Sequence, residues 1–205
     1  MSALVELAPG LHRWTARHPD ADPNAAPGSA ADWGPDVGCI AYEATDALLL
    51  VDPLVPEDRG DLEDELDALV RRHGRRVAIV TTLQFHRRSR ERLAERYVAS
   101  TSRARTTLPE GVETVRIEGG GETMVWLPRP RALVPGDRLL GDDAGGLRLC
   151  PESWLRYLPS GMRHPALREA LRPLLGLPVE MVLVSHGEPV LANGRAAIAR
   201  ALEAG

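Results

Sequence analysis

The feature that most constrains the fold of this chain is a set of apolar runs that each end in a polar turn. ALLLVDP spans Ala47 to Pro53, LVPGDRLL spans Leu133 to Leu140, and MVLVSHGEP spans Met181 to Pro189. The first is a continuous apolar run bounded by turn residues, which is typical of a strand buried on both faces. Strands that end in this way place polar side chains at the edge of a sheet.

Strands and helices alternate through the first half of the chain. After the run at Ala47 to Pro53, Glu57 to His73 carries leucines at helical spacing and ends before Gly74, a typical C-cap. The pattern then repeats with a strand at Val77 to Thr81, a helix at Ser89 to Tyr97 and a short strand near Val98. Strands separated by helices indicate a layered α/β core.

Hairpins are expected before and after this segment. LVELAPGLHRWTA predicts two short strands joined at Pro9-Gly10, and VGCIAYEATDALLLVDP predicts a further hairpin. Residues 17–36 between them, rich in Pro, Gly, Asp and Ala, form a long loop of the kind that often covers a functional site. From Val112 onward, VETVRIE, ETMVWLP and RALVPG predict short antiparallel strands.

The last third of the chain is mainly helical. Pro151 to Leu175 reads as helix in two pieces, broken around Pro159 to Gly161. A strand is expected at Val179 to Ser185 and a final helix at Asn193 to Glu203.

Length and charge narrow the class of protein. The 205 residues, 43% of them hydrophobic, suffice for one substantial core, so we expect a single domain over 1–205. The net charge is −4 and no basic cluster stands out, which argues against a nucleic-acid partner. All 25 basic residues are Arg, so a lysine nucleophile or Schiff base is excluded.

No segment predicts membrane association. The N-terminal MSALVELAPGLHRW lacks the basic and apolar regions of a signal peptide, and no apolar run approaches the ~20 residues of a membrane span. Cys39 and Cys150 have no metal-binding or redox spacing and are expected to be buried, reduced thiols. We therefore expect a cytoplasmic protein with a small-molecule ligand or substrate; nothing in the sequence sets its oligomeric state.

In their order and strand contexts, the three runs resemble the metallo-β-lactamase superfamily, which has an Asp in a Gly-Asp turn and a late strand followed by His. The resemblance covers the chain from about Leu4 to the last helix. It implies an α/β (α+β) fold, an αββα sandwich of two mixed sheets with helices outside. It also implies that Asp137 and His186 occupy metal-binding positions, and that Asp52 orients the metal-binding loop without being a ligand.

Where the superfamily carries Thr-His-x-His-x-Asp-His, this chain has VAIVTTLQFHRRSRE. Aligning on Thr81 puts Thr82 and Gln84 at the first two histidines, His86 at the Asp and Arg87 at the third histidine. Aligning on Thr82 instead leaves His86 between ligand positions. The later histidine is also missing, because that stretch reads IEGGGETMVWLP. The resemblance therefore predicts no dinuclear centre.

A reduced site would consist of His86, Asp137 and His186. Two imidazoles and one carboxylate suit a single Zn²⁺, Fe²⁺ or Mn²⁺ with open positions for water. Each residue also has a simpler reading. Asp137 could cap its own turn, as Gly-Asp pairs often do, and His186 could be a solvated turn residue. We expect either one divalent metal or none, with the three side chains in one polar cluster in both cases.

Other residues are candidates for ligand contact. Arg87 and Arg88 lie at the start of a helix, where a cation is unfavourable unless an anion or acidic partner is near, and guanidinium groups suit carboxylate or phosphate. A solvated face with Arg–Glu pairs is the alternative. Trp33 in the long loop could be a substrate platform or pack on the sheet edge. His18 could reach over the same mouth, although a lone loop histidine is more often a surface residue. Asp52 is expected to cap Pro53 and its turn.

Two functions are compatible with these residues. One is a divergent hydrolase with a single metal at His86, Asp137 and His186, acting on a small ester, thioester or lactone. The other is a non-catalytic relative, a pseudoenzyme that keeps the cleft and binds an anionic small molecule at Arg87 or Arg88. Loss of ligands favours the second, and retention of Asp137 and His186 favours the first.

Overall fold

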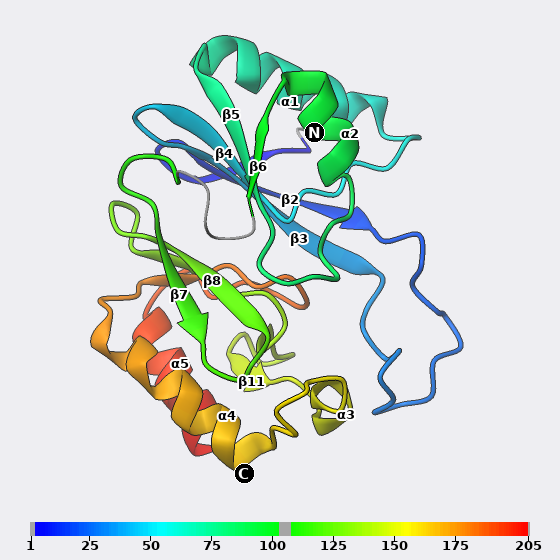
Figure 1. The fold of residues 1–205 in the computed structure, drawn as a ribbon, viewed down its shortest axis with the longest axis vertical. Coiled ribbons are helices and arrows are strands. Elements are labelled where there is room, and N and C mark those ends of the chain that lie inside the picture. The colour runs from blue at the N-terminus through cyan, green and yellow to red at the C-terminus, as the bar shows by residue number, and fades with distance from the viewer. Residues whose placement is uncertain (1–2, 103–107, 205) are drawn as a thin grey trace.

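Four layers make up the fold: helices, a sheet, a second sheet, and helices again (Figure 1). The computed structural model describes residues 3–102 and 108–204. Helices α1 and α2 cover the outer face of one sheet, and α4 and α5 cover the outer face of the other (Figure 1). The predicted αββα sandwich is therefore confirmed.

The first sheet has six strands in chain order. The pairs β1–β2, β2–β3 and β3–β4 are antiparallel, and the pairs β4–β5 and β5–β6 are parallel. The strands are β1 (Val5–Ala8), β2 (Leu11–Arg17), β3 (Asp36–Glu43), β4 (Ala47–Val51), β5 (Arg76–Val80) and β6 (Ser100–Ser102).

The second sheet has the order β12-β9-β8-β7, and a separate two-stranded hairpin lies beside it. Only the β12–β9 pair is parallel. The sheet consists of β7 (Glu113–Ile117), β8 (Glu122–Leu127), β9 (Ala132–Val134) and β12 (Met181–Val182), and the hairpin of β10 (Leu139–Gly141) and β11 (Leu147–Leu149).

The helices follow the predicted order, with a break between α3 and α4. They are α1 (Gly60–His73), α2 (Arg90–Tyr97), α3 (Glu152–Leu155), α4 (His164–Leu171), the 3₁₀ helix η1 (Arg172–Gly176) and α5 (Gly194–Glu203). Gly74 ends α1 with a φ of 64°, as expected of a C-cap glycine. Among the described residues, no helix has the length and apolar character needed to cross a membrane.

Alternation along β4 explains why its sequence is apolar at every position. Leu48 and Leu50 pack toward α1 and α2, whereas Leu49 and Val51 pack into the core between the two sheets. Because successive side chains point to opposite faces, a strand covered on both sides needs apolar residues throughout. The prediction that this strand is buried on both faces is confirmed.

Some predicted boundaries were wrong. The last strand was expected over Val179 to Ser185, but only Met181–Val182 pair in the sheet, because the neighbouring strand β9 has three residues. The strand expected near Val98 begins at Ser100, and Val98 itself ends α2 in a left-handed conformation. The β10–β11 hairpin was not predicted; its strands are too short to give a pattern.

Candidate functional site

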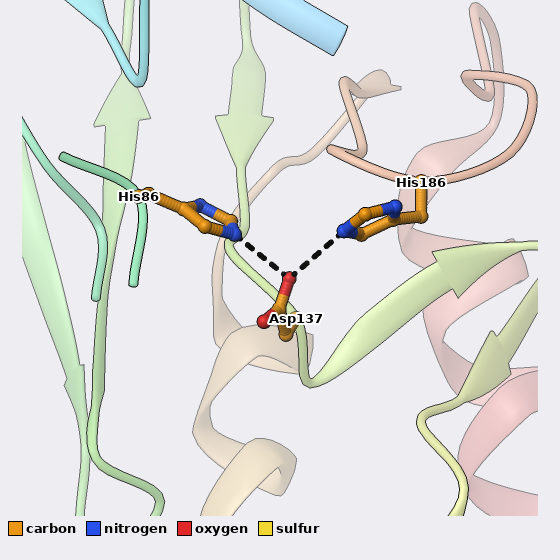
Figure 2. Close-up of side chains that lie close together, drawn as sticks. All are labelled: His86, Asp137 and His186. Atoms are coloured by element: carbon orange, nitrogen blue, oxygen red, sulfur yellow. Dashed lines mark ion pairs between the residues drawn. The ribbon is translucent and has the colours of Figure 1, made fainter. Parts of the chain in front are cut away.

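Three strand ends converge on one cluster, as predicted. Figure 2 shows His86 and His186 approaching the carboxylate of Asp137 from opposite sides. Asp137 Oδ1 lies 3.0 Å from His86 Nε2 and 3.5 Å from His186 Nε2. One potential ligand atom from each residue lies within 4.8 Å of the other two. His86 follows β5, Asp137 lies between β9 and β10, and His186 follows β12.

Asp52 holds His86 from the side away from Asp137. Its Oδ2 accepts a hydrogen bond from His86 Nδ1 at 2.9 Å and another from the Thr82 hydroxyl at 2.6 Å, while Oδ1 accepts the Thr82 N–H. Asp52 has a φ of 48°, a left-handed conformation that Asp tolerates better than most residues. Asp52 lies behind the cluster, as expected. It was also expected to cap Pro53 and its turn, but its carboxylate instead accepts hydrogen bonds from Thr82 and His86.

Glu122 holds the turn that carries Asp137. Its buried carboxylate accepts the backbone N–H groups of Gly136, Asp137 and Arg138 at 2.7–2.9 Å. A Cβ on Gly136 would lie 2.3 Å from Leu83 and 2.6 Å from the Thr82 hydroxyl, so only glycine fits there. Asp137 therefore does not cap its own turn: Glu122 accepts these N–H groups, and the Asp137 side chain faces the histidines. Sequence reasoning missed Glu122.

Two glycines and two tryptophans position His186. Gly187, with a φ of 83°, packs against Gly141 so closely that a Cβ on it would lie 2.7 Å from the Gly141 carbonyl oxygen. Gly141 donates its N–H to the His186 carbonyl at 2.9 Å. The rings of Trp33 and Trp154 meet the His186 ring edge to face, with centroids 5.7 and 5.6 Å away. His186 is thus buried between aromatic rings, which excludes the solvated turn histidine.

The charges in the cluster are strongly coupled. Burial alone would lower the pKa of His86, but the Asp137 and Asp52 carboxylates outweigh it and raise that pKa to about 9. Burial lowers the pKa of His186 to about 4, against the attraction of Asp137. Burial would raise the pKa of Asp137, but the two histidines hold it well below its usual range. Without a metal, His86 is an imidazolium between two carboxylates, and His186 is neutral.

The two arginine candidates differ. The Arg88 side chain lines the cavity, but its Nη1 donates to the Gly38 and Asp52 carbonyls and its Nη2 donates to the Ser185 hydroxyl at 2.6 Å. Only its buried Nε has no partner. Arg88 thereby connects β3, the Asp52 turn and the residue before His186. Arg87 is exposed and does not line the cavity.

A cavity of about 330 Å³ lies over the cluster. Trp33 and His18, from the long loop, both line it, and their rings are in edge-to-face contact with centroids 5.0 Å apart. Four of the eight aromatic residues of the chain contribute to the lining: Trp33, Phe85, Trp154 and Tyr157. The volume falls in the usual range for small-molecule sites, about 300–1,000 Å³.

The donor set fits one divalent cation. Tetrahedral ligands that are each about 2.0–2.2 Å from a metal lie about 3.4 Å apart, close to the two nitrogen–oxygen distances around Asp137. His86 also has the carboxylate behind its second nitrogen that metal-binding histidines usually have. Thr82 donates its hydroxyl to Asp52, and Gln84 is exposed, so neither joins the cluster. Within residues 3–102 and 108–204, no second group of three metal-binding side chains was found.

Comparison with known proteins places the fold. No protein-family model and no curated protein sequence matches the chain. Among solved structures, the metallo-β-lactamase DIM-1 matches with a TM-score of 0.63 and 15% identity, over 98% of this chain and 95% of that one. A metallo-β-lactamase from Erythrobacter litoralis matches with a TM-score of 0.59 and 17% identity, over 98% and 90%.

The flavodiiron protein from Giardia intestinalis matches with a TM-score of 0.60 and 14% identity, over 98% of this chain and 57% of that one. The matches span nearly the whole chain, at identities too low to show more than a common fold. The protein has the metallo-β-lactamase fold.

Proposed function

We propose that this protein is a hydrolase that uses a single divalent metal ion held by His86, Asp137 and His186, and that it acts on a small ester, thioester or lactone. One observation carries the proposal: three potential ligand atoms lie within 4.8 Å of one another beneath a cavity of small-molecule size. A metal-dependent fold type alone would not suffice, because folds host many functions.

The residues of the chain prepare the cluster for a cation. Asp52 orients the His86 ring and favours presentation of Nε2, and Glu122 fixes the turn from which Asp137 projects. A bound Zn²⁺, Fe²⁺ or Mn²⁺ would supply Lewis-acid chemistry, polarising a carbonyl and making water a nucleophile near neutral pH. The aromatic lining would exclude bulk water and bind the apolar part of the substrate.

The overall reaction is a simple hydrolysis. The oxygen of water bonds to the carbonyl carbon, and the C–O or C–S bond to the leaving group breaks. One proton of water goes to the leaving group, and the other is released from the new carboxylic acid. His18 is a proposed substrate contact: its Nδ1 accepts the Asp20 N–H, so the neutral ring carries its proton on Nε2 and can donate there. Burial, with the charge of Arg88, lowers the pKa of His18 and favours this neutral form.

One observation favours a second candidate, a non-catalytic protein that binds an anionic small molecule. His86 and Asp137 form a 3.0 Å ion pair that needs no metal to satisfy either charge. In this alternative the anion would meet the unpartnered Nε of Arg88 or the exposed Arg87. Most of the Arg88 guanidinium is already bonded to protein oxygens, which makes this the weaker candidate.

Metal content and melting temperature separate the two candidates. Protein purified without chelator should contain about one metal ion per chain, and EDTA should lower the melting temperature while Zn²⁺, Mn²⁺ or Fe²⁺ restores it. Ester and lactone hydrolysis should follow metal content. A melting curve unchanged by EDTA and by all three ions would reject the hydrolase and leave the binding protein.

A further inference from the structure

A second, larger groove lies next to the cavity. Its volume is about 940 Å³, and Phe85, Arg138, Trp154 and Tyr157 line both spaces, so that the two are adjacent. The groove is lined by residues of β7, the Gly119–Gly121 turn and the segment Thr81–Phe85, and Trp33 does not line it. It is therefore a candidate extension of the proposed active site.

The groove lies where the sequence lacks expected ligands. Thr82 and Gln84, aligned with two histidines of the superfamily motif, line it, and so do Gly119 and Gly121 from the stretch that lacks the later histidine. None of these residues presents an imidazole or carboxylate, and the two glycines have no side chain. The space beside the retained cluster is thus open.

The charges that line the groove are paired with one another. Arg116 lies 3.8 Å from Glu118 at the exposed end, and Arg138 lies 3.8 Å from Glu122 at the buried end. With two cations and two anions, the groove has no net charge. It favours an uncharged occupant over an anion or a cation, because each guanidinium already faces a carboxylate.

The groove has exposed apolar residues at its lining and two unpartnered polar groups among its lining residues. Phe85 and Tyr157 are 63% and 65% exposed, and they belong to a small group of exposed large hydrophobic residues within the described parts of the chain. Exposed apolar side chains beside a cavity are surface that a ligand would bury. Two residues of the lining carry a buried polar group without a hydrogen-bond partner: the hydroxyl of Thr81, a residue only 3% exposed, and the indole N–H of Trp154. The pair suits an apolar chain that also carries a hydrogen-bond acceptor.

We propose that this groove binds the uncharged acyl chain of an extended substrate, whose reacting carbonyl lies over His86, Asp137 and His186. This inference rests on the proposed hydrolase function for the identity of the head group. The groove itself can be tested without metal or catalysis.

The test is binding of N-alkylacetamides, from butyl to decyl, to the EDTA-treated full chain, followed by calorimetry and by tryptophan fluorescence. Each is an uncharged chain with one carbonyl acceptor. We expect the association constant to rise about fourfold per methylene until the groove is full, since burying one CH₂ contributes about 0.8 kcal/mol. Affinity that does not change with chain length would overturn the proposal.

Filling the groove should remove the length dependence. In Thr114→Trp, on the groove face of β7, the decyl compound should bind no better than the butyl compound. Glu113→Trp is the matched control, because Glu113 is exposed on the same strand and does not line the groove. Ser160→Trp, at another exposed residue of the lining, provides a second blocking variant if Thr114→Trp does not fold. A length dependence retained in the folded blocking variants would also overturn the proposal.

The two proposals fail separately. Chain-length-dependent binding in a protein that takes up no metal would leave the groove standing and reject the hydrolase. Metal binding and hydrolysis without any chain-length dependence would reject the groove proposal and leave the hydrolase proposal standing.

Discussion

The two sides of the central cleft differ in how their residues are held. On the retained side, defined by His86, Asp137 and His186, each side chain has supporting contacts: Asp52 behind His86, Glu122 beneath the Asp137 turn, and two tryptophans around His186. On the open side, defined by Thr82, Gln84 and the Gly119–Gly121 turn, the positions where the superfamily has ligands carry none.

This difference is informative because burying a charged supporting residue costs folding free energy. A buried carboxylate such as Glu122 is unfavourable unless its hydrogen bonds are complete. Replacing both members of a buried ion pair with apolar residues is often neutral or stabilising, whereas removing one member alone is destabilising. Asp52, Glu122 and the two tryptophans each contact a retained residue or the turn that carries Asp137, although Glu122 also lines the groove. The predictions below test this support in order of decreasing effect.

The largest effect should come from Glu122→Ala. It leaves three backbone N–H groups without an acceptor and the buried Arg138 guanidinium without its carboxylate, so we expect a loss of about 3–5 kcal/mol in the free energy of unfolding. Denaturant titration measures it. Glu118→Ala, four residues away on the open side and 87% exposed, should change stability by less than about 0.5 kcal/mol. Equal effects would mean that Glu122 gives the Asp137 turn no more support than an exposed carboxylate does.

Glu122 also marks the limit of what the sequence could predict. The strand ends at His86, Asp137 and His186 were predictable, because apolar runs locate strands and the resemblance brings their ends together. Glu122 is the first residue of the apolar strand β8, a position that is often exposed, and its hydrogen-bond donors come from a turn 14–16 residues later. No local pattern encodes a contact of that kind.

Parts of the fold escaped prediction for related reasons. The β10–β11 hairpin has three residues per strand, too few for an alternating pattern. The length of β12 is set by its partner β9 and not by its own apolar run. Arg88 looked like an anion contact because its charge at a helix start needed a partner; the partners are main-chain carbonyls and the Ser185 hydroxyl from distant segments.

The second prediction concerns metal linkage. Asp137→Ala should abolish the stabilisation by metal, about 2.7 kcal/mol at a free ion concentration of 100 times Kd. The measurement is the melting temperature of wild type and variant with EDTA and with Zn²⁺. Gln84→Ala, on the open side and exposed, should keep the full metal response. A metal response that survives in Asp137→Ala would mean that the ligands lie elsewhere.

The third prediction uses the pKa of His86, about 9 without metal. A histidine whose folded pKa is raised above the unfolded value of about 6.5 stabilises the fold below pH 6.5, and that stabilisation is lost as the pH rises toward 9. In EDTA, the free energy of unfolding should therefore fall by roughly 2 kcal/mol between pH 6.5 and 8.5. This pH range ends below the pKa of Cys150, which burial raises to about 11, so the folded protein keeps this thiol protonated throughout.

With saturating metal the same range should be nearly flat, because His86 is then unprotonated in the folded state as it is in the unfolded chain. His186, whose pKa is about 4, adds no slope above pH 6.5; below it, the unfolded chain takes up the proton first and stability declines toward pH 4. Parallel curves with EDTA and with metal would indicate that the ion does not reach His86.

The smallest effect should come from Asp52→Asn, which keeps the shape of the side chain and removes its charge. The amide oxygen can still accept a hydrogen bond from His86 Nδ1, but without its negative charge it no longer stabilises the protonated His86 ring. The Thr82 hydroxyl also loses its carboxylate acceptor. Changes behind a metal-binding histidine typically weaken metal affinity by about 10–100-fold, and we expect a loss in that range, measured by competition with a chromophoric chelator. Asp46→Asn is the matched control, since Asp46 pairs with Arg76 at the surface, far in sequence from the cluster.

In EDTA, Asp52→Asn should also weaken the pH dependence of stability between pH 6.5 and 8.5, because one of the two carboxylates that raise the pKa of His86 is gone. If affinity and pH dependence both stay at wild-type values, Asp52 acts only as a backbone anchor for Thr82, and the retained side is held by Asp137 and Glu122 alone.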